Sequence, residues 1–114
     1  MPIVFLSPEC KNEKLSELEE LIPAFDFVFT SENEACQDLC DLIAEKIPCM
    51  HLFSTEKLNL RECSRENFNT VVNKFSLRTG SVLIIAQKEY FNILIPGFMT
   101  DEWQTLSFEE KFLI

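Results

Sequence analysis

The sequence predicts an α/β domain, with an α+β arrangement as the alternative. Apolar segments typical of strands alternate three times with amphipathic segments typical of helices. The connections between them are short, which favours right-handed crossovers and a mainly parallel sheet. In the α+β alternative the helices would cover one face of a mostly antiparallel sheet. We therefore expect a single domain, residues 1–114, in which three helices pack on a mixed sheet of about five strands.

The first elements follow from short apolar runs and their terminators. Ile3 to Leu6 is an apolar run that ends at Ser7-Pro8, which predicts a strand. Asn12 can cap a helix that ends at Pro23. Phe25 to Thr30 places phenyl rings at alternate positions, which predicts a second strand. The apolar stripe of the intervening helix is Leu15, Leu18, Leu21 and Ile22.

Ser31 to Glu34 has the pattern of a capping box, in which the hydroxyl and the carboxylate satisfy each other's free backbone amides. It predicts a helix that Pro48 ends. Cys49 to Ser54 predicts a third strand, and the polar stretch Thr55 to Cys63 predicts a connection. The apolar face of the helix is Ala35, Cys36, Leu39, Cys40, Leu42, Ile43 and Ile47.

Ser64 is the expected cap of a third helix, which Arg78-Thr79-Gly80 would end. Val82 to Ala86 and Tyr90 to Ile95 are then two apolar strands separated by a short polar break, which predicts an apolar β-hairpin. Such a hairpin needs cover on at least one face. The stripe of the third helix is Phe68, Val71, Val72 and Phe75. From Phe98 to Ile114 no period dominates, so a short helix and a final strand both stay open.

The charge restricts the choice of partners. Nineteen acidic residues against ten basic residues give a net charge of −9. This charge opposes binding to nucleic acid and to anionic membranes, and no run of Lys or Arg offers a local exception. Two interpretations stay open: the charge keeps a small protein soluble, or it complements a basic partner such as the substrate groove of a nuclease.

The cysteines and the N-terminal segment indicate a cytoplasmic location for the protein. The five cysteines follow no disulfide framework. The N-terminal segment has no basic region, and its apolar run is too short for a signal peptide. No stretch has the length of apolar residues that a membrane span needs. We expect a cytoplasmic protein with reduced thiols.

No catalytic or nucleotide-binding motif is present. The chain has two glycines, Gly80 and Gly97, and neither a GxGxxG nor a GxxxxGK[ST] pattern. GxSxG, HExxH and EF-hand patterns are absent too. The sequence therefore predicts a protein that is not an enzyme and has no cofactor.

A cluster of thiols and the separate thiol of Cys10 raise two alternatives to a binding protein, a metal site and a thiol-dependent activity. Cys36, Cys40, Cys49 and His51 lie within sixteen positions, but their spacing matches no common zinc site, so a core role is preferred to a metal site. Cys10 follows the first strand and precedes the first helix, a position where open α/β sheets bind ligands and where a helix N-terminus lowers a thiol pKa. A small thiol-dependent enzyme or redox protein built on Cys10 is therefore the alternative function.

The acidic residues define two candidate partner-binding surfaces. The first is the polar side of the second helix, and the second surrounds Trp103 in the tail. Carboxylates around an aromatic side chain are typical of an anchor for a basic partner, and Tyr90 is a second aromatic candidate. Solvated helix faces and a core role for Trp103 are the competing interpretations. The candidate residues are Glu32, Glu34, Asp38, Asp41, Tyr90, Asp101, Glu102 and Trp103.

The segment Thr79 to Tyr90, a glycine, an apolar strand and a polar turn, resembles a segment of immunity proteins from bacterial contact-dependent growth inhibition systems. Those are small, acidic, cytosolic proteins that bind and block one cognate toxin domain, frequently a nuclease. The resemblance implies an immunity protein or antitoxin that occludes the active site of a basic toxin, as a monomer or in a 1:1 complex. An adaptor subunit of a larger assembly shares most of these features and is a further alternative.

Overall fold

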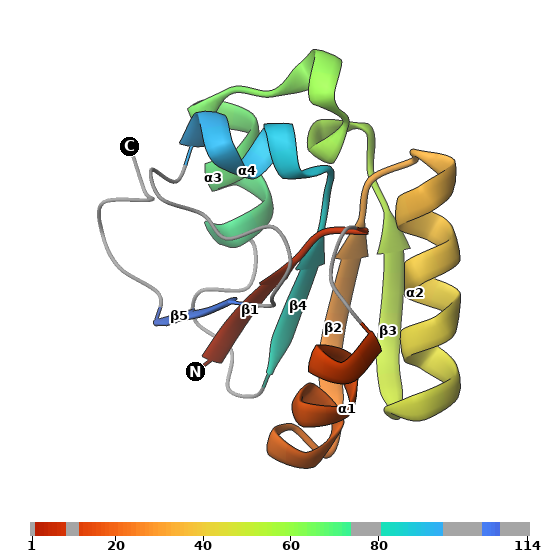
Figure 1. Ribbon diagram of the computed structural model, residues 1–114. Helices are drawn as coiled ribbons and strands as arrows, with labels where there is room; N and C mark the ends of the chain where they lie inside the picture. The colour runs from red at the N-terminus through yellow and green to blue at the C-terminus, as the bar shows by residue number, and fades with distance from the viewer. Residues whose placement is uncertain (1, 9–11, 74–80, 95–103, 108–114) are drawn as a thin grey trace.

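A five-stranded sheet organises the computed structural model, which describes residues 2–8, 12–73, 81–94 and 104–107. The strand order is β3-β2-β4-β1-β5, and Figure 1 shows this order across the sheet. Four strands are parallel to one another, and β5 runs antiparallel to β1. The strands are β1 (Pro2–Leu6), β2 (Phe25–Thr30), β3 (Cys49–Ser54), β4 (Val82–Ile85) and β5 (Gln104–Ser107).

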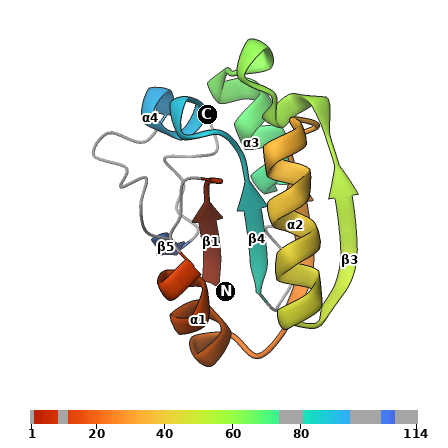
Figure 2. The same ribbon diagram turned by 45° about the vertical axis from the view of Figure 1, so that its right-hand side comes forward.

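Helices cover both faces of the sheet, so the α/β class is confirmed for the described residues. Helices α1 and α2 contribute to one apolar cluster, and α3, α4 and the first of two short 3₁₀ turns contribute to the other. Figure 2 shows α2 in front of the sheet and α3 behind it. The helices are α1 (Asn12–Leu21), α2 (Glu34–Lys46), α3 (Arg65–Asn73) and α4 (Lys88–Leu94), and the 3₁₀ turns are η1 (Glu56–Leu58) and η2 (Leu60–Glu62). A layer of helices on each side of mainly parallel strands excludes the α+β alternative here.

The predicted β-hairpin is wrong, because its second half is a helix. The Tyr90 N–H donates to the Gln87 carbonyl at 3.0 Å, which begins α4. Tyr90, Phe91 and Leu94 are buried, whereas Ile93 is 64% exposed. Burial at positions i, i+1 and i+4 is the pattern of a helix with one face on the core. The described residues therefore contain a fourth helix, which the sequence did not predict.

Two local predictions at the helices need correction. Leu21 was assigned to the apolar stripe of α1 but is 64% exposed. The capping box at Ser31 does not form: Asn33 is the N-cap of α2, and its Oδ1 accepts hydrogen bonds from the Ala35 and Cys36 amides. The predicted start of α3 is confirmed, because the Ser64 hydroxyl accepts a hydrogen bond from the Asn67 amide at 3.0 Å.

A bulge in β2 changes the direction of its phenyl rings. The Asp26 and Phe27 amides both donate to the Ser81 carbonyl, at 2.9 and 3.3 Å. Two successive amides that share one acceptor are the hydrogen-bond pattern of a β-bulge, which changes the alternation of side chains. Phe25 consequently packs against α1 and α2, whereas Phe27 and Phe29 lie on the opposite face. The expected alternating row of three rings is therefore divided between the two cores.

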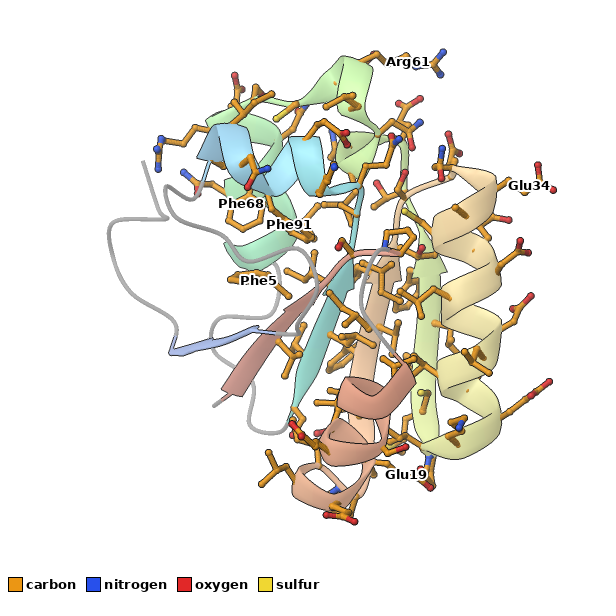
Figure 3. The ribbon with its side chains drawn as sticks, in the orientation of Figure 1. Phe5, Glu19, Glu34, Arg61, Phe68 and Phe91 are labelled. Atoms are coloured by element: carbon orange, nitrogen blue, oxygen red, sulfur yellow. The ribbon has the colours of Figure 1, made fainter. Side chains whose placement is uncertain are left out.

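Aromatic rings fill the core beneath α3 and α4. Phe5 lies 5.7 Å from Phe68 and 5.5 Å from Phe91, measured between ring centroids. Figure 3 shows these three side chains grouped between β1 and the two helices. Tyr90 completes the group, with centroids 6.3 Å from Phe68 and 6.0 Å from Phe91. Tilted and edge-on ring pairs of this kind are the favoured aromatic geometries.

Candidate interaction surface

Strand β3 lies at one edge of the sheet and is the most exposed apolar segment of the described chain. Met50 is 73% exposed, Leu52 47% and Phe53 44%, and His51 is exposed as well. Figure 1 shows β3 at the end of the strand order, next to α2. Exposed edge strands with neither Lys nor Pro are unusual, because they pair readily with other chains. We expect such a strand to have a binding role.

Part of the β3 backbone faces outward. The Thr55 N–H donates to the Thr30 carbonyl at 2.9 Å, so this backbone position faces β2. Successive residues of a strand direct their backbone groups to opposite sides. The N–H and C=O groups of Leu52 and Ser54 therefore point away from β2, toward the open edge.

A row of aromatic rings lies on the α3 side of this edge. Phe27 stacks on His51 with centroids 5.2 Å apart, and Phe29 stacks on Phe53 at 5.4 Å. Phe27 and Phe29 pack against the core, whereas the rings on β3 are exposed. The parallel register explains the pairing, because Phe27 lies opposite His51 and Phe29 opposite Phe53. The exposed rings of His51 and Phe53 therefore lie at the edge, and each is stacked on a phenyl ring of β2.

A groove separates β3 from α2 on the other side of the sheet. It has a volume of about 370 Å³, and Asp41, Ala44 and Leu52 are among its lining residues. The Gln37 side chain bridges the groove by donating from Nε2 to the Ser54 hydroxyl at 3.1 Å. The groove therefore combines apolar side chains with polar ones and has one carboxylate, that of Asp41, in its lining.

The predicted acidic residues of α2 lie on its exposed face. Glu34, Asp38 and Asp41 are all exposed, as is Glu45. Figure 3 shows Glu34 directed away from the sheet, on the side of the molecule where β3 lies. The helix N-terminus stabilises Glu34 electrostatically. The structure therefore brings the acidic face of α2 beside the exposed strand β3.

Of the other predicted site residues in the described part of the chain, Tyr90 does not join this surface. Tyr90 is fully buried, and its hydroxyl donates to the Lys57 carbonyl at 2.8 Å, so it is a core residue and not an exposed anchor. Burial also raises the pKa of Tyr90. Asp101, Glu102 and Trp103 lie outside the described residues, as does the predicted end of the third helix at Arg78 to Gly80.

Glu32 belongs to a second hollow, at the carboxyl end of the sheet. Open α/β sheets commonly bind ligands at this end. The hollow has a volume of about 360 Å³ and is lined by Glu32, Asn33, Asn59, Leu60, Arg61 and Gln87. Its polar groups bind one another: Asn59 Oδ1 accepts from the Ser31 hydroxyl at 2.7 Å and from the Glu32 amide at 2.8 Å, and Asn59 Nδ2 donates to Glu32 Oε1 at 3.1 Å. These bonds fix the loops that follow β2 and β3, which gives this end of the sheet a structural role.

The thiol and metal alternatives gain no support from the described residues. Cys36 and Cys40 are buried on α2, and Cys49 packs against the same core, whereas His51 stacks on Phe27 on the opposite face. In the part of the chain that the structure describes, no group of His, Cys, Asp and Glu could hold a metal ion. Burial raises the pKa of Cys40 to about 11 and also raises the pKa values of Cys49 and Cys63, which opposes thiolate chemistry. Cys10 lies outside the described residues.

The exposure of the β3 side chains was not predicted from the sequence. Cys49 to Ser54 was expected as a strand, and an apolar strand is expected to be covered. Its exposure follows from the strand order, which places β3 at an edge. No pattern within the segment signals this position.

Within the described residues, no helix has the length and apolar character needed to cross a bilayer.

Comparisons with known proteins identify no family for this chain. No protein-family model matches the chain, and neither the curated proteins nor the solved structures that were searched contain a match. The function is therefore inferred from the sequence and from the surface formed by β3 and α2.

Proposed function

We propose that this protein is a non-catalytic inhibitor of a basic protein, in the manner of an immunity protein or antitoxin that occludes the active site of a nuclease-type toxin. The observation that carries the proposal is the position of an exposed apolar strand, β3, beside the acidic face of α2. We call this combination the β3–α2 surface; it comprises residues 50–54 of β3 and Glu34, Gln37, Asp38, Asp41 and Glu45 of α2.

The two parts of the β3–α2 surface have different roles in binding. Apolar and aromatic side chains such as Leu52 and Phe53 supply contact area that is desolvated in a complex. The carboxylates of Asp38 and Asp41 attract a basic partner and orient it before contact. An apolar centre with a charged rim is the usual composition of a protein–protein interface.

The overall charge supports a basic partner. A net charge of −9 on 114 residues repels nucleic acid and anionic membranes, and attracts proteins that bind nucleic acid. Carboxylates on the inhibitor would take the place of substrate phosphates in the active site of such a partner. The absence of catalytic motifs from the sequence and the resemblance of Thr79–Tyr90 to immunity proteins agree with this role, although that segment forms β4 and the start of α4 rather than a strand and a turn. The proposal includes a cytoplasmic location and a 1:1 complex.

A matched pair of charge-reversal variants tests the proposal. Asp38→Lys/Asp41→Lys changes the β3–α2 surface, and Glu19→Lys/Glu20→Lys makes the same change of charge on the exposed face of α1. Figure 3 shows Glu19 near the C-terminal end of α1, at the opposite end of the molecule from Glu34. Both variants raise the net charge equally, so a difference between them reports position alone.

The experiment begins with capture of partners from the native host and ends with an activity assay. Each captured basic protein is purified, and its activity is titrated with the wild type and with both variants. We expect complete inhibition at one equivalent, association that slows as salt rises, and an on-rate reduced about tenfold or more by Asp38→Lys/Asp41→Lys only. Equal loss in both variants, or capture without inhibition of any partner, would contradict the proposal.

A further inference from the structure

We infer that the partner binds by adding an extended segment to β3 as a further strand of the sheet, with cationic side chains toward α2 and apolar side chains on the aromatic row. This inference rests on the proposed function, because it takes the partner to be a basic protein. It adds that the partner makes contact through an extended segment whose residues alternate between basic and apolar.

The backbone of β3 provides the first argument. The N–H and C=O groups of Leu52 and Ser54 point toward the open edge, as the alternation from the Thr55–Thr30 hydrogen bond requires. An added strand pairs with these groups without any change in the existing sheet. Main-chain pairing of this kind supplies affinity, and the pockets on the two sides of the strand supply specificity.

The groove between β3 and α2 selects cationic side chains. Its apolar lining includes Leu52, Cys40 and Ala44, and its rim carries Asp41. Arg and Lys suit this shape, because their aliphatic stems lie on apolar surface while the charged end reaches a carboxylate. Asp38 and Glu45 on the same exposed helix face extend the negative field beyond the groove.

The α3 side of the edge selects apolar or aromatic side chains. A groove of about 230 Å³ lies beside the aromatic row and is lined in part by Phe29, Phe53 and Val71. Lys57 is the charged residue in this lining and disfavours a second cation there. An aromatic side chain can stack on the exposed rings of His51 and Phe53, and a branched aliphatic side chain can pack against them. The two sides of the edge therefore require a strand that alternates between basic and apolar residues.

A second copy of this chain is a poorer occupant of the same edge. Antiparallel pairing of two β3 strands about a two-fold axis places both copies of α2 on the same face of the joined sheet. The carboxylates beside the edge, including Asp41, would then approach their own copies. Like charges at this position oppose the dimer, whereas a basic segment neutralises them.

Three synthetic peptides with blocked ends test the inference. The first alternates basic and apolar residues, Ser-Arg-Val-Arg-Phe-Arg-Val-Ser. The second is a block isomer of the same composition and charge, Ser-Arg-Arg-Arg-Val-Phe-Val-Ser, and the third replaces each Arg of the first by Glu. We expect the alternating peptide to bind about fivefold more tightly than its block isomer, as two or three added cross-strand pairs imply, and the acidic peptide not to bind.

Amide hydrogen exchange, followed by NMR, locates the contact. The Leu52 and Ser54 amides should become protected in the complex with the alternating peptide. Asp41→Asn should weaken binding of this peptide about threefold, whereas the matched variant Glu20→Gln on α1 should leave it unchanged. These variants change exposed side chains and leave the core intact.

Several results would overturn the inference. Equal binding of the alternating peptide and the block isomer would show attraction by charge without strand addition, and the proposed function would then stand alone. Unchanged exchange at Leu52 and Ser54 would have the same meaning. Self-association of the free protein in sedimentation analysis, with these two amides already protected, would identify a second copy as the occupant.

Discussion

Strand β4 lies in the middle of the sheet with all four of its residues buried, whereas β3 lies at the edge and exposes five of its six residues. Both strands are apolar segments of similar length, and both run parallel to β2. The difference comes from their places in the strand order. β4 has neighbours on both edges and helices over both faces, whereas β3 has β2 on one side only.

This contrast separates apolar residues that stabilise the fold from apolar residues that are available to a partner. Leu83 is fully buried among side chains of β1, β2 and the two helices of its face. Leu52 has the same register position, because Val28 of β2 pairs with Leu83 on one side and with Leu52 on the other, but Leu52 borders a groove open to solvent. Mutation should therefore affect stability at one position and binding at the other.

The largest expected effect is the difference in stability between two variants, each of which truncates one of these leucines to alanine. Leu83→Ala should lower the free energy of unfolding by about 2–5 kcal/mol, because it removes buried methyl groups and leaves a cavity. Leu52→Ala should lower it by less than about 1 kcal/mol, since its side chain is 47% exposed. Urea denaturation of both variants measures the difference. Similar losses in the two variants would show that β3 is covered in the free protein.

A smaller effect is expected from the hydroxyl of Tyr90, which connects α4 to the middle residue of η1, the turn that follows β3. Tyr90→Phe removes the hydrogen bond to the Lys57 carbonyl, 2.8 Å long, and leaves this carbonyl without the donor. We expect a loss of about 1–1.5 kcal/mol in the free energy of unfolding. Binding through the β3–α2 surface should be unchanged. An unfolding midpoint equal to that of the wild type would argue against this contact.

The cap of α2 provides a test on the acidic side of the surface. Asn33→Ala removes the acceptor for the Ala35 and Cys36 amides and should cost about 1 kcal/mol of stability. Asn33→Asp retains the acceptor and serves as the matched control. Helicity by circular dichroism and the thermal midpoint both report the change. Equal midpoints for the Ala and Asp variants would contradict the assignment of Asn33 as the N-cap.

A further effect is confined to alkaline pH and comes from the thiol of Cys40. Burial, with a contribution from the Asp41 carboxylate, raises its pKa from 9.0 to about 11 in the folded protein. The neutral thiol is therefore favoured by folding, so this contribution is complete below pH 9 and is lost as the pH rises from 9 toward 11. Denaturation at a series of pH values should show a smaller decline in this range for Cys40→Ala than for the wild type. An equal decline would remove Cys40 as a cause.

The sequence predicted the features that depend on local patterns. The apolar positions of α2 other than the exposed Ala35, the positions Phe68 and Val71 of α3, the strand segments β1 to β4 and the cap at Ser64 were all recognisable. The pattern of α4 was present too, because Tyr90, Phe91 and Leu94 have helical spacing, but a run of apolar residues this short fits a strand as well.

The features that depend on distant contacts were not predictable. Ser31 binds Asn59 rather than capping α2, and Asn59 lies twenty-eight residues further along the chain, beyond β3 and η1. The bulge at Asp26 and Phe27 depends on the Ser81 carbonyl, fifty-four residues from Phe27, and it decides which face each ring covers. The acidic half of the candidate surface was predicted from helix periodicity, whereas its apolar half required the position of β3 in the strand order.

Amide hydrogen exchange of the free protein tests most directly whether β3 is an open edge. We expect fast exchange at Leu52 and Ser54, whose amides face outward. Slow exchange is expected at Phe53, whose amide faces β2, and along the interior strand β4. An alternating pattern along β3 would establish that its outer backbone groups are free to pair with a partner. Slow exchange at Leu52 and Ser54 in the monomer would contradict this account, because the edge would already be covered.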